Sequence, residues 1–280
     1  MPAPAVVESH NYVSRFVALA WLSLLQLLRA PSHSRRAEAA RRAARHILLL
    51  AGGVGVSIIA LMYVLDAWEI GLMPQRGTAS LWWVRILTDF GKDEYVLATL
   101  AAFLIAVAII SPALRGIQRS LLLGLGTRLQ FIFCAVLVPV LIAEMIKWTV
   151  GRGRPFVGGD ANVFNFAHFA GTSAYSSFPS GHATTAFALA FAVAAVWPRA
   201  RVPMIVYALI IVATRLVLLA HHPSDVVAGA LVGTIGALFV RYWFAARRLG
   251  FAIHQDGTIV SLAGPSPGRL KRVARSVFAP

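Results

Sequence analysis

Charged side chains are scarce in this chain, and acidic ones are the scarcest. Of 280 residues, 58% are hydrophobic and 13% are charged, with 11 acidic side chains against 26 lysines and arginines. So few charges cannot cover the surface of a water-soluble domain of this length. The composition therefore excludes an ordinary soluble protein and indicates an integral membrane protein.

Cysteine is nearly absent as well. The single cysteine, Cys134, cannot form an internal disulfide, and its apolar surroundings favour a packing role. The net charge of +15 is compatible with nucleic-acid binding. Basic residues also collect in the cytoplasmic loops of membrane proteins, however. We adopt this second interpretation and expect no nucleic-acid partner.

Six apolar runs predict the architecture. A helix needs about 20 apolar residues to cross a bilayer, and a spanning segment must be helical because lipid offers no partner to the backbone. The runs lie near 47–66, 96–114, 128–148, 183–198, 201–220 and 225–245. We therefore predict an all-α integral membrane protein, a six-transmembrane-helix bundle formed by residues 47–246. Residues 1–46 would be a cytoplasmic segment with an interfacial helix near 13–29, and residues 247–280 a basic cytoplasmic tail.

The charges of the connections predict the orientation. Arginines and lysines dominate the segment before the first span, the loops after the second and fourth spans, and the tail. The loop after the first span instead holds five of the 11 acidic residues: Asp66, Glu69, Asp89, Asp93 and Glu94. Because basic connections stay inside, we expect both termini in the cytoplasm of a bacterial inner or plasma membrane.

Three short blocks gather residues suited to phosphate chemistry. The first runs from Lys147 to Arg154-Pro155, the second is Pro179-Ser180-Gly181-His182, and the third runs from Thr214-Arg215 through His221 to Asp225. The predicted topology places all three at the outer ends of spans three to six. Three cations can hold a phosphate dianion, and two histidines can divide nucleophilic attack and protonation between them. A carboxylate can fix the tautomer of the attacking histidine.

In order and internal spacing, these blocks resemble the signature of the type 2 phosphatidic acid phosphatase superfamily. Thr214 departs from the serine that is usual in that family, but it keeps a hydroxyl. The resemblance implies that His221 is the nucleophile, that Asp225 orients it, and that His182 is the general acid. It also implies that phosphate is bound by Lys147, Arg154, Ser180, Gly181 and Arg215. It implies no metal and no cofactor, and only Glu144, Asp160 and Asp225 are acids near the site, too few for a two-metal clamp.

Several nearby residues keep two interpretations. Arg152 could bind phosphate or a lipid headgroup, and Glu144 could serve function or pair with Lys147 or Arg152. His222 is better read as a helix cap than as a reactant. The aromatic residues of the loop between the first two blocks could pack that loop or form an apolar collar that admits a lipid tail, and we favour the collar.

The sequence thus predicts a phosphatase of lipid phosphates or diphosphates that works through a phosphohistidine and faces the periplasm or exterior. Undecaprenyl diphosphate is the substrate that we name first. A phosphotransferase with a hydroxyl acceptor would use the same residues, and a catalytically dead lipid-binding or transport protein is the alternative from another class. The expected partners are the lipid phosphate and membrane lipids, and nothing in the sequence points to an obligate protein partner.

Overall fold

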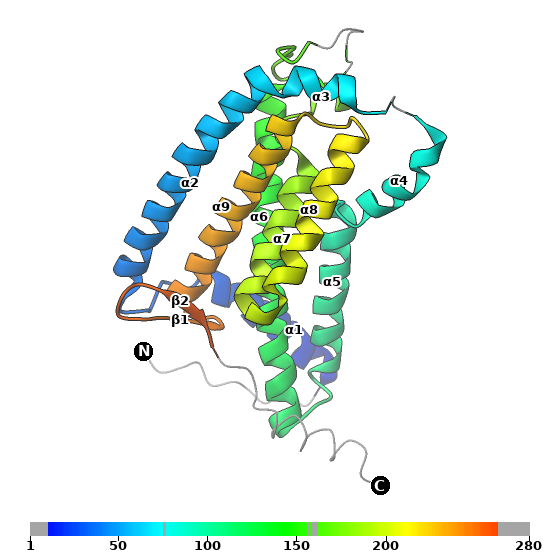
Figure 1. The fold of residues 1–280 in the computed structure, drawn as a ribbon. Helices are drawn as coiled ribbons and strands as arrows, with labels where there is room; N and C mark the ends of the chain where they lie inside the picture. The colour runs from blue at the N-terminus through cyan, green and yellow to red at the C-terminus, as the bar shows by residue number, and fades with distance from the viewer. Residues whose placement is uncertain (1–10, 75–76, 156, 158–161, 263–280) are drawn as a thin grey trace.

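The computed structural model describes residues 11–74, 77–155, 157 and 162–262, and helices make up most of them (Figure 1). The α-helices are α1 (Tyr12–Leu28), α2 (Arg36–Val64), α3 (Asp66–Leu72), α4 (Trp82–Asp89), α5 (Asp93–Ile110), α6 (Gly116–Val150), α7 (Gly181–Val196), α8 (Arg201–Val217) and α9 (Pro223–Ala246). Short 3₁₀ turns are η1 (Ala79–Leu81), η2 (Ser173–Tyr175) and η3 (Pro198–Ala200). Strands β1 (Phe251–Ile253) and β2 (Ile259–Ser261) form an antiparallel hairpin in which Phe251 lies opposite Ser261. The predicted all-helical class is confirmed, with this hairpin added.

Five helical stretches are long and apolar enough to cross a membrane, rather than the six predicted. They are Arg36–Val64, Ala79–Ile110, Gly116–Val150, Pro198–Val217 and Pro223–Ala246. The predicted fourth span corresponds to α7, which has 16 residues and ends where Trp197-Pro198 interrupts it. Sixteen residues rise about 24 Å, less than the ~30 Å hydrocarbon core of a bilayer. The protein is a membrane protein, and by length alone α7 does not qualify as one of its spans.

Short as it is, α7 lies at the centre of the bundle, where α6, α8 and α9 all pack against it. Its contact with α9 is unusually close because of two glycines spaced four residues apart. A Cβ atom at Gly229 would lie 2.4 Å from the carbonyl oxygen of Ser180, and one at Gly233 would lie 2.3 Å from that of Thr184. Small residues at this spacing let helix backbones approach each other in membranes. The contact fixes the start of α7 beside the start of α9.

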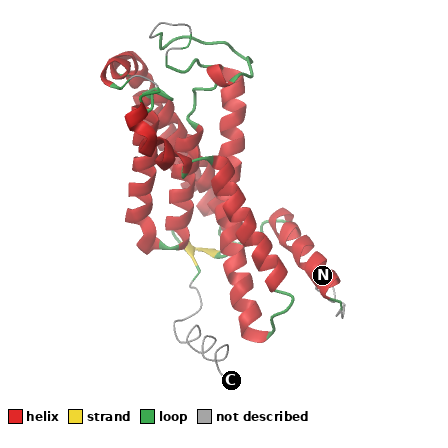
Figure 2. Ribbon diagram, turned by 90° about the vertical axis from the view of Figure 1, so that its right-hand side faces the viewer, coloured by secondary structure: helices red, strands yellow, loops and turns green. Residues whose placement is uncertain are grey.

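The bundle has two ends of different character. At one end, which we call the histidine end, α6 ends at Val150, α7 begins at Gly181, α8 ends at Val217 and α9 begins at Pro223. Helix α3 and the loop that follows α6 lie over this end (Figures 1 and 2). The opposite end, which we call the arginine end, carries the β1–β2 hairpin and α1 (Figure 1).

The predicted interfacial helix near 13–29 forms as α1, and it is tied to the arginine end by specific contacts. The Tyr12 hydroxyl donates to the Ile109 carbonyl at 2.6 Å, and the Gln26 side chain donates to that of Gln130 at 2.7 Å. The Trp243 indole donates to the Leu27 carbonyl at 3.1 Å. These contacts attach α1 to α5, α6 and α9, and its placement at the membrane interface stays a prediction.

Candidate active site

The first two sequence blocks meet where α6 ends and α7 begins. Lys147 lies in the last turn of α6, and a Cβ atom at Gly181 would lie only 2.9 Å from its Nζ. The ammonium forms an ion pair with Glu144, whose side chain is 57% exposed. Of the two interpretations of Glu144, the structure thus contains the pairing with Lys147. The absence of a side chain at Gly181 is what admits the lysine to the start of α7.

The start of α7 offers unsatisfied polar groups. Ser180 occupies the N-cap position, as predicted, with extended backbone, and its N–H donates to the Asp225 carbonyl at 2.9 Å. Its side chain makes no capping bond. The Ser180 hydroxyl and the His182 Nε2 atom are both buried without a hydrogen-bond partner among the described residues. Buried polar groups are nearly always paired, and a helix N-terminus favours anions, so these two atoms mark a place for an anionic ligand.

His221 is held in one tautomer by a backbone carbonyl. Its Nδ1 atom lies 2.8 Å from the carbonyl oxygen of Ser177, and the side chain is buried. A carbonyl only accepts hydrogen bonds, so Nδ1 must carry the proton and Nε2 of the neutral ring keeps its lone pair. Burial lowers the pKa of His221 well below its usual value, and the charges of Arg215 and Arg154 lower it further. The ring is therefore neutral near pH 7 and its Nε2 can act as a nucleophile.

The two predicted phosphate-binding arginines are each anchored by an element outside their own block. Arg154 donates from Nε to the Ser173 carbonyl at 2.9 Å. Arg215 donates from Nη1 to the Thr88 hydroxyl of α4 at 2.8 Å, and the Thr214 hydroxyl donates to the same oxygen at 3.0 Å. Both arginines act electrostatically on His182 and on His221. The fold therefore brings all three blocks together.

The connection between α4 and α5 also reaches the site. A Cβ atom at Gly91 would lie 3.4 Å from Cδ2 of His182 and 2.5 Å from Cγ2 of Ile211, so only glycine fits there without displacing a neighbour. Lys92, which pairs with Asp89 at 2.8 Å, is a further cation that acts on His182. Neither Lys92 nor Thr88 was predicted as a site residue, because both lie outside the three blocks and the charges of this segment indicated only sidedness.

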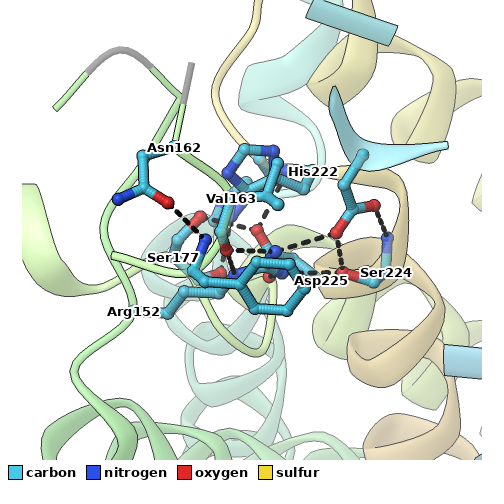
Figure 3. Close-up of polar contacts among 10 residues, drawn as sticks. Arg152, Asn162, Val163, Ser177, His222, Ser224 and Asp225 are labelled. Carbon is cyan, nitrogen blue, oxygen red and sulfur yellow. Dashed lines mark hydrogen bonds and ion pairs between the residues drawn. The ribbon is translucent and has the colours of Figure 1, made fainter. Parts of the chain in front are cut away.

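Asp225 makes different contacts from those predicted (Figure 3). Its carboxylate accepts from Nη1 of Arg152 at 2.6 Å, from the Ser177 hydroxyl at 2.6 Å and from the His222 backbone N–H at 2.9 Å. The direct bond to the His221 ring that we predicted is not among the hydrogen bonds of the described residues. Asp225 lies in the first turn of α9, so its carboxylate turns back to His222, the N-cap residue. Ser177 links Asp225 to His221, because its hydroxyl donates to the Asp225 carboxylate and its carbonyl accepts from Nδ1 of His221.

Arg152 is fully occupied by protein acceptors. Its Nη1 also donates to Ser224 at 2.7 Å, its Nη2 to Asp66 at 2.8 Å and to the Val163 carbonyl at 2.9 Å, and its Nε to the same carbonyl at 3.1 Å. A guanidinium has five N–H groups, and together with the bond to Asp225 these contacts use all five. Arg152 is thus a buried structural cation, and no donor remains for the phosphate that we considered as its ligand.

Asp66 completes this network from a distant part of the chain. It lies at the start of α3, is fully buried, and accepts from the backbone N–H of Ser224 at 3.0 Å and from the Ser224 hydroxyl. From the sequence, Asp66 was predicted only to be one of the acids of an outer loop. A usable signal was present, because Asp66 and Glu69 follow an apolar run directly and no basic residue comes before Arg76. Their partners had to come from elsewhere in the fold.

Glu69 is a second buried acid of α3. Both of its carboxyl oxygens lack a hydrogen-bond partner among the described residues. Burial raises the pKa of Glu69 to about 7, with smaller contributions from the negative charges of Asp66 and Asp225. The side chain therefore exchanges its proton close to neutral pH.

Two aromatic residues of the loop between the first two blocks pack against helices. Phe164 contacts Tyr63 of α2 with ring centroids 5.1 Å apart, and Phe169 contacts Trp148 of α6 at 4.8 Å. Both phenylalanines also remain partly exposed. Phe156 and Asp160 lie outside the described residues.

The part of the chain that contains the three blocks is similar to known proteins. The model of the PAP2 superfamily matches residues 128–249, which include all three blocks. Residues 128–249 form a PAP2 superfamily domain. The helices before residue 128, with Asp66, Thr88 and Lys92, lie outside the matched region.

Individual relatives are named as phosphatases of lipid phosphates or, in one case, as a transport protein. The chain is 41% identical over 127 residues to a protein of Rhizobium johnstonii named lipid A 1-phosphatase, covering 45% of this chain and 52% of that protein. It is 32% identical over 139 residues to the putative undecaprenyl-diphosphatase YbjG of Escherichia coli, covering 47% of this chain and 65% of that protein. It is 28% identical over 171 residues to the bacitracin transport permease protein BcrC of Bacillus licheniformis, covering 61% of this chain and 82% of that protein. The matched part thus spans about half the length of the lipid A 1-phosphatases, and no solved structure is significantly similar to the chain.

Proposed function

We propose that the chain hydrolyses the phosphate or diphosphate of a membrane lipid, with His221 as the nucleophile. The observation that carries the proposal is the bond from Nδ1 of His221 to the Ser177 carbonyl, which leaves Nε2 available for attack. The unpartnered Ser180 hydroxyl and the cations Lys147, Arg154 and Arg215 supply the electrostatic stabilisation that a transferring phosphoryl group needs.

The proposed reaction has two steps. In the first, the Nε2 lone pair attacks phosphorus, the bond from phosphorus to the leaving oxygen breaks, and His182 donates a proton to that oxygen. In the second, His182 takes a proton from water, the water oxygen attacks phosphorus, and the P–N bond breaks to release phosphate. The negative charge of the bound phosphate offsets the cations around His182 and so favours the protonated ring that the first step requires.

A lipid substrate is supported by the surroundings of the site. The histidine end adjoins helices whose outer surfaces carry exposed apolar side chains, such as Ile142, Met145 and Trp148 on α6. The relatives' names point to two phosphate carriers, lipid A and undecaprenyl diphosphate. The higher identity to the lipid A 1-phosphatases makes a glycolipid phosphate the first substrate to test, ahead of the undecaprenyl diphosphate that the sequence alone suggested.

The charge pattern of the connections supports a site that faces away from the cytoplasm, with both termini inside. This orientation needs an even number of crossings, so it requires that the short helix α7 cross the membrane together with the five longer helical stretches. A reporter enzyme that works only outside the cytoplasm, inserted between residues 157 and 170, should be active. Activity of a reporter that requires the cytoplasm at the same position would contradict this orientation.

The reaction is tested by phosphate release from lipid A, undecaprenyl diphosphate and phosphatidic acid, with purified protein in detergent and a chelator. We expect release without any added acceptor, which separates a hydrolase from a phosphotransferase. His221→Ala should lower the rate on the best substrate by at least about 10³-fold, because the nucleophile is lost.

The matched control is His168→Ala, which removes a loop histidine bonded to the Thr149 carbonyl and should leave the rate unchanged. Wild-type activity in His221→Ala would refute the assignment of the nucleophile. Release that depends strictly on added metal would refute the mechanism, and no release from any lipid would favour the lipid-binding alternative.

A further inference from the structure

The arginine end contains a large pocket that the proposed reaction does not use. Its volume is about 940 Å³, within the range of small-molecule sites. Helix α7 provides most of its apolar lining, from Phe187 to Val196, and α8 and α9 contribute Ala208 and Thr234. Strand β2 and Leu262 close one side. Four arginines from four elements surround the pocket: Arg128, Arg199, Arg201 and Arg241.

These arginines have no acidic counterpart in the pocket. No aspartate or glutamate is present among the described residues that line it. Arg241 donates to the Ile259 carbonyl, and Arg128 donates to the Leu262 carbonyl at 3.1 Å. The Nε atom of Arg241 is buried without a hydrogen-bond partner in the described part of the chain. Uncompensated guanidinium groups on a concave surface attract anions, above all phosphate, which arginine binds with paired hydrogen bonds.

The apolar lining along α7 indicates that the ligand has an apolar part in addition to its anionic group. From Val196 to Phe187 the pocket follows α7 for about 13 Å, at 1.5 Å per residue. A small soluble anion would leave this depth unfilled. On the neighbouring helix α8, the apolar side chains Ile205, Val206 and Leu209 are about half exposed, as expected of a surface that faces lipid. A molecule with an anionic head and an acyl chain matches both parts.

We propose that this pocket binds an anionic phospholipid, with its phosphate among the four arginines and an acyl chain along α7. The chain's own tail is a poor occupant, because residues 263–280 contain four basic side chains and no acidic one. The pocket is also separate from the proposed reaction. Trp197 and His182 are fifteen residues apart along α7 and its end, about 22 Å. The two proposals can therefore fail independently.

Native mass spectrometry of the delipidated full chain tests the site. Phosphatidylglycerol should bind about tenfold more tightly than phosphatidylcholine, whose head carries no net charge. The double substitution Arg199→Gln and Arg201→Gln should weaken phosphatidylglycerol about tenfold, as expected when charge-assisted hydrogen bonds are lost. The matched control, Arg36→Gln with Arg115→Gln, removes two exposed arginines that do not line the pocket and should bind as the wild type does.

Two further experiments show whether the pocket binds a whole lipid or only a phosphate group. Ala194→Phe fills the apolar part of the pocket, so it should weaken phosphatidylglycerol while the arginines stay in place. Inorganic phosphate at millimolar concentration should not displace the lipid. Equal binding of the two lipids, unchanged binding by the Arg199→Gln, Arg201→Gln protein, or displacement by inorganic phosphate would each overturn the proposal.

Discussion

The two ends of the bundle handle positive charge in opposite ways. At the histidine end, Arg152 has no exposed surface and every one of its N–H groups contacts a carboxylate, a hydroxyl or a carbonyl. At the arginine end, Arg199 and Arg201 are exposed beside a pocket whose described lining contains no acid. Removing a charge from water is costly unless partners replace the water, whereas an exposed charge needs none. Arg152 is therefore a structural cation, whereas Arg199 and Arg201 are available to a ligand.

Replacing one arginine by methionine at each end of the bundle should give the largest difference in stability. Arg152→Met leaves Asp66 and Asp225 buried without their cation, so we expect a loss of about 3–5 kcal/mol in the free energy of unfolding. Arg201→Met, its matched control at the arginine end, should change that free energy by less than about 0.5 kcal/mol. Thermal unfolding in detergent measures both.

A second variant shows whether the cost comes from the unpaired acids. Adding Asp66→Asn to Arg152→Met removes one of the stranded carboxylates, so the double variant should lose less stability than the sum of the two single variants. Equal melting temperatures for Arg152→Met and Arg201→Met would contradict the contrast between the ends.

Ser177 tests how the buried network reaches the proposed nucleophile. Ser177→Ala removes the hydroxyl that donates to Asp225 but keeps the carbonyl that accepts from His221. We expect about a tenfold fall in kcat with little change in KM, and a loss of about 1 kcal/mol in stability. Steady-state kinetics on the best lipid substrate measures the effect.

The control for Ser177 is its neighbour. Ser176→Ala removes a hydroxyl that donates to the Thr172 carbonyl at 2.8 Å, away from Asp225. Its kinetics should match the wild type. If both variants lost kcat equally, the effect would come from the loop as a whole and not from the link between Asp225 and His221.

The effect of Glu69 appears only as a dependence of stability on pH. The pKa of Glu69 rises from 4.5 to about 7 in the folded protein, so the folded state binds the proton more tightly than the unfolded state does. Stability should therefore fall as the pH rises from about 4.5 to about 7 and stay lower above that. Glu69→Gln should abolish this fall and stabilise the protein by about 1–2 kcal/mol at pH 8.

The exposed acid Glu94, at the start of α5, offers the control. Glu94→Gln should leave the pH dependence of the melting temperature as it is in the wild type. A fall between pH 4.5 and 7 that persists in Glu69→Gln would mean that another group carries the titration.

Much of the candidate site could be predicted from the sequence because its residues come in short blocks. The spacing within each block is local, and helix starts such as Ser180 have a recognisable pattern. The bond between Asp225 and Ser177 could not be predicted, because it depends on how a loop of some thirty residues folds back over α9. The roles of Asp66, Thr88 and Lys92 were missed for the same reason, since each lies far in sequence from the residue that it contacts.

By itself, the sequence determined that the chain is helical and resides in a membrane, and that it carries three blocks of residues suited to phosphate chemistry, because composition and local spacing encode these properties. Only the tertiary structure decided which charges are buried. Arg152 and Arg154 lie two residues apart in the first block, yet one is enclosed by Asp66 and Asp225 while the other contacts the Ser173 carbonyl and acts electrostatically on both histidines. The acceptors that enclose Arg152 come from α3, the loop after α6 and the first turn of α9, so only the tertiary fold could bring them to one guanidinium.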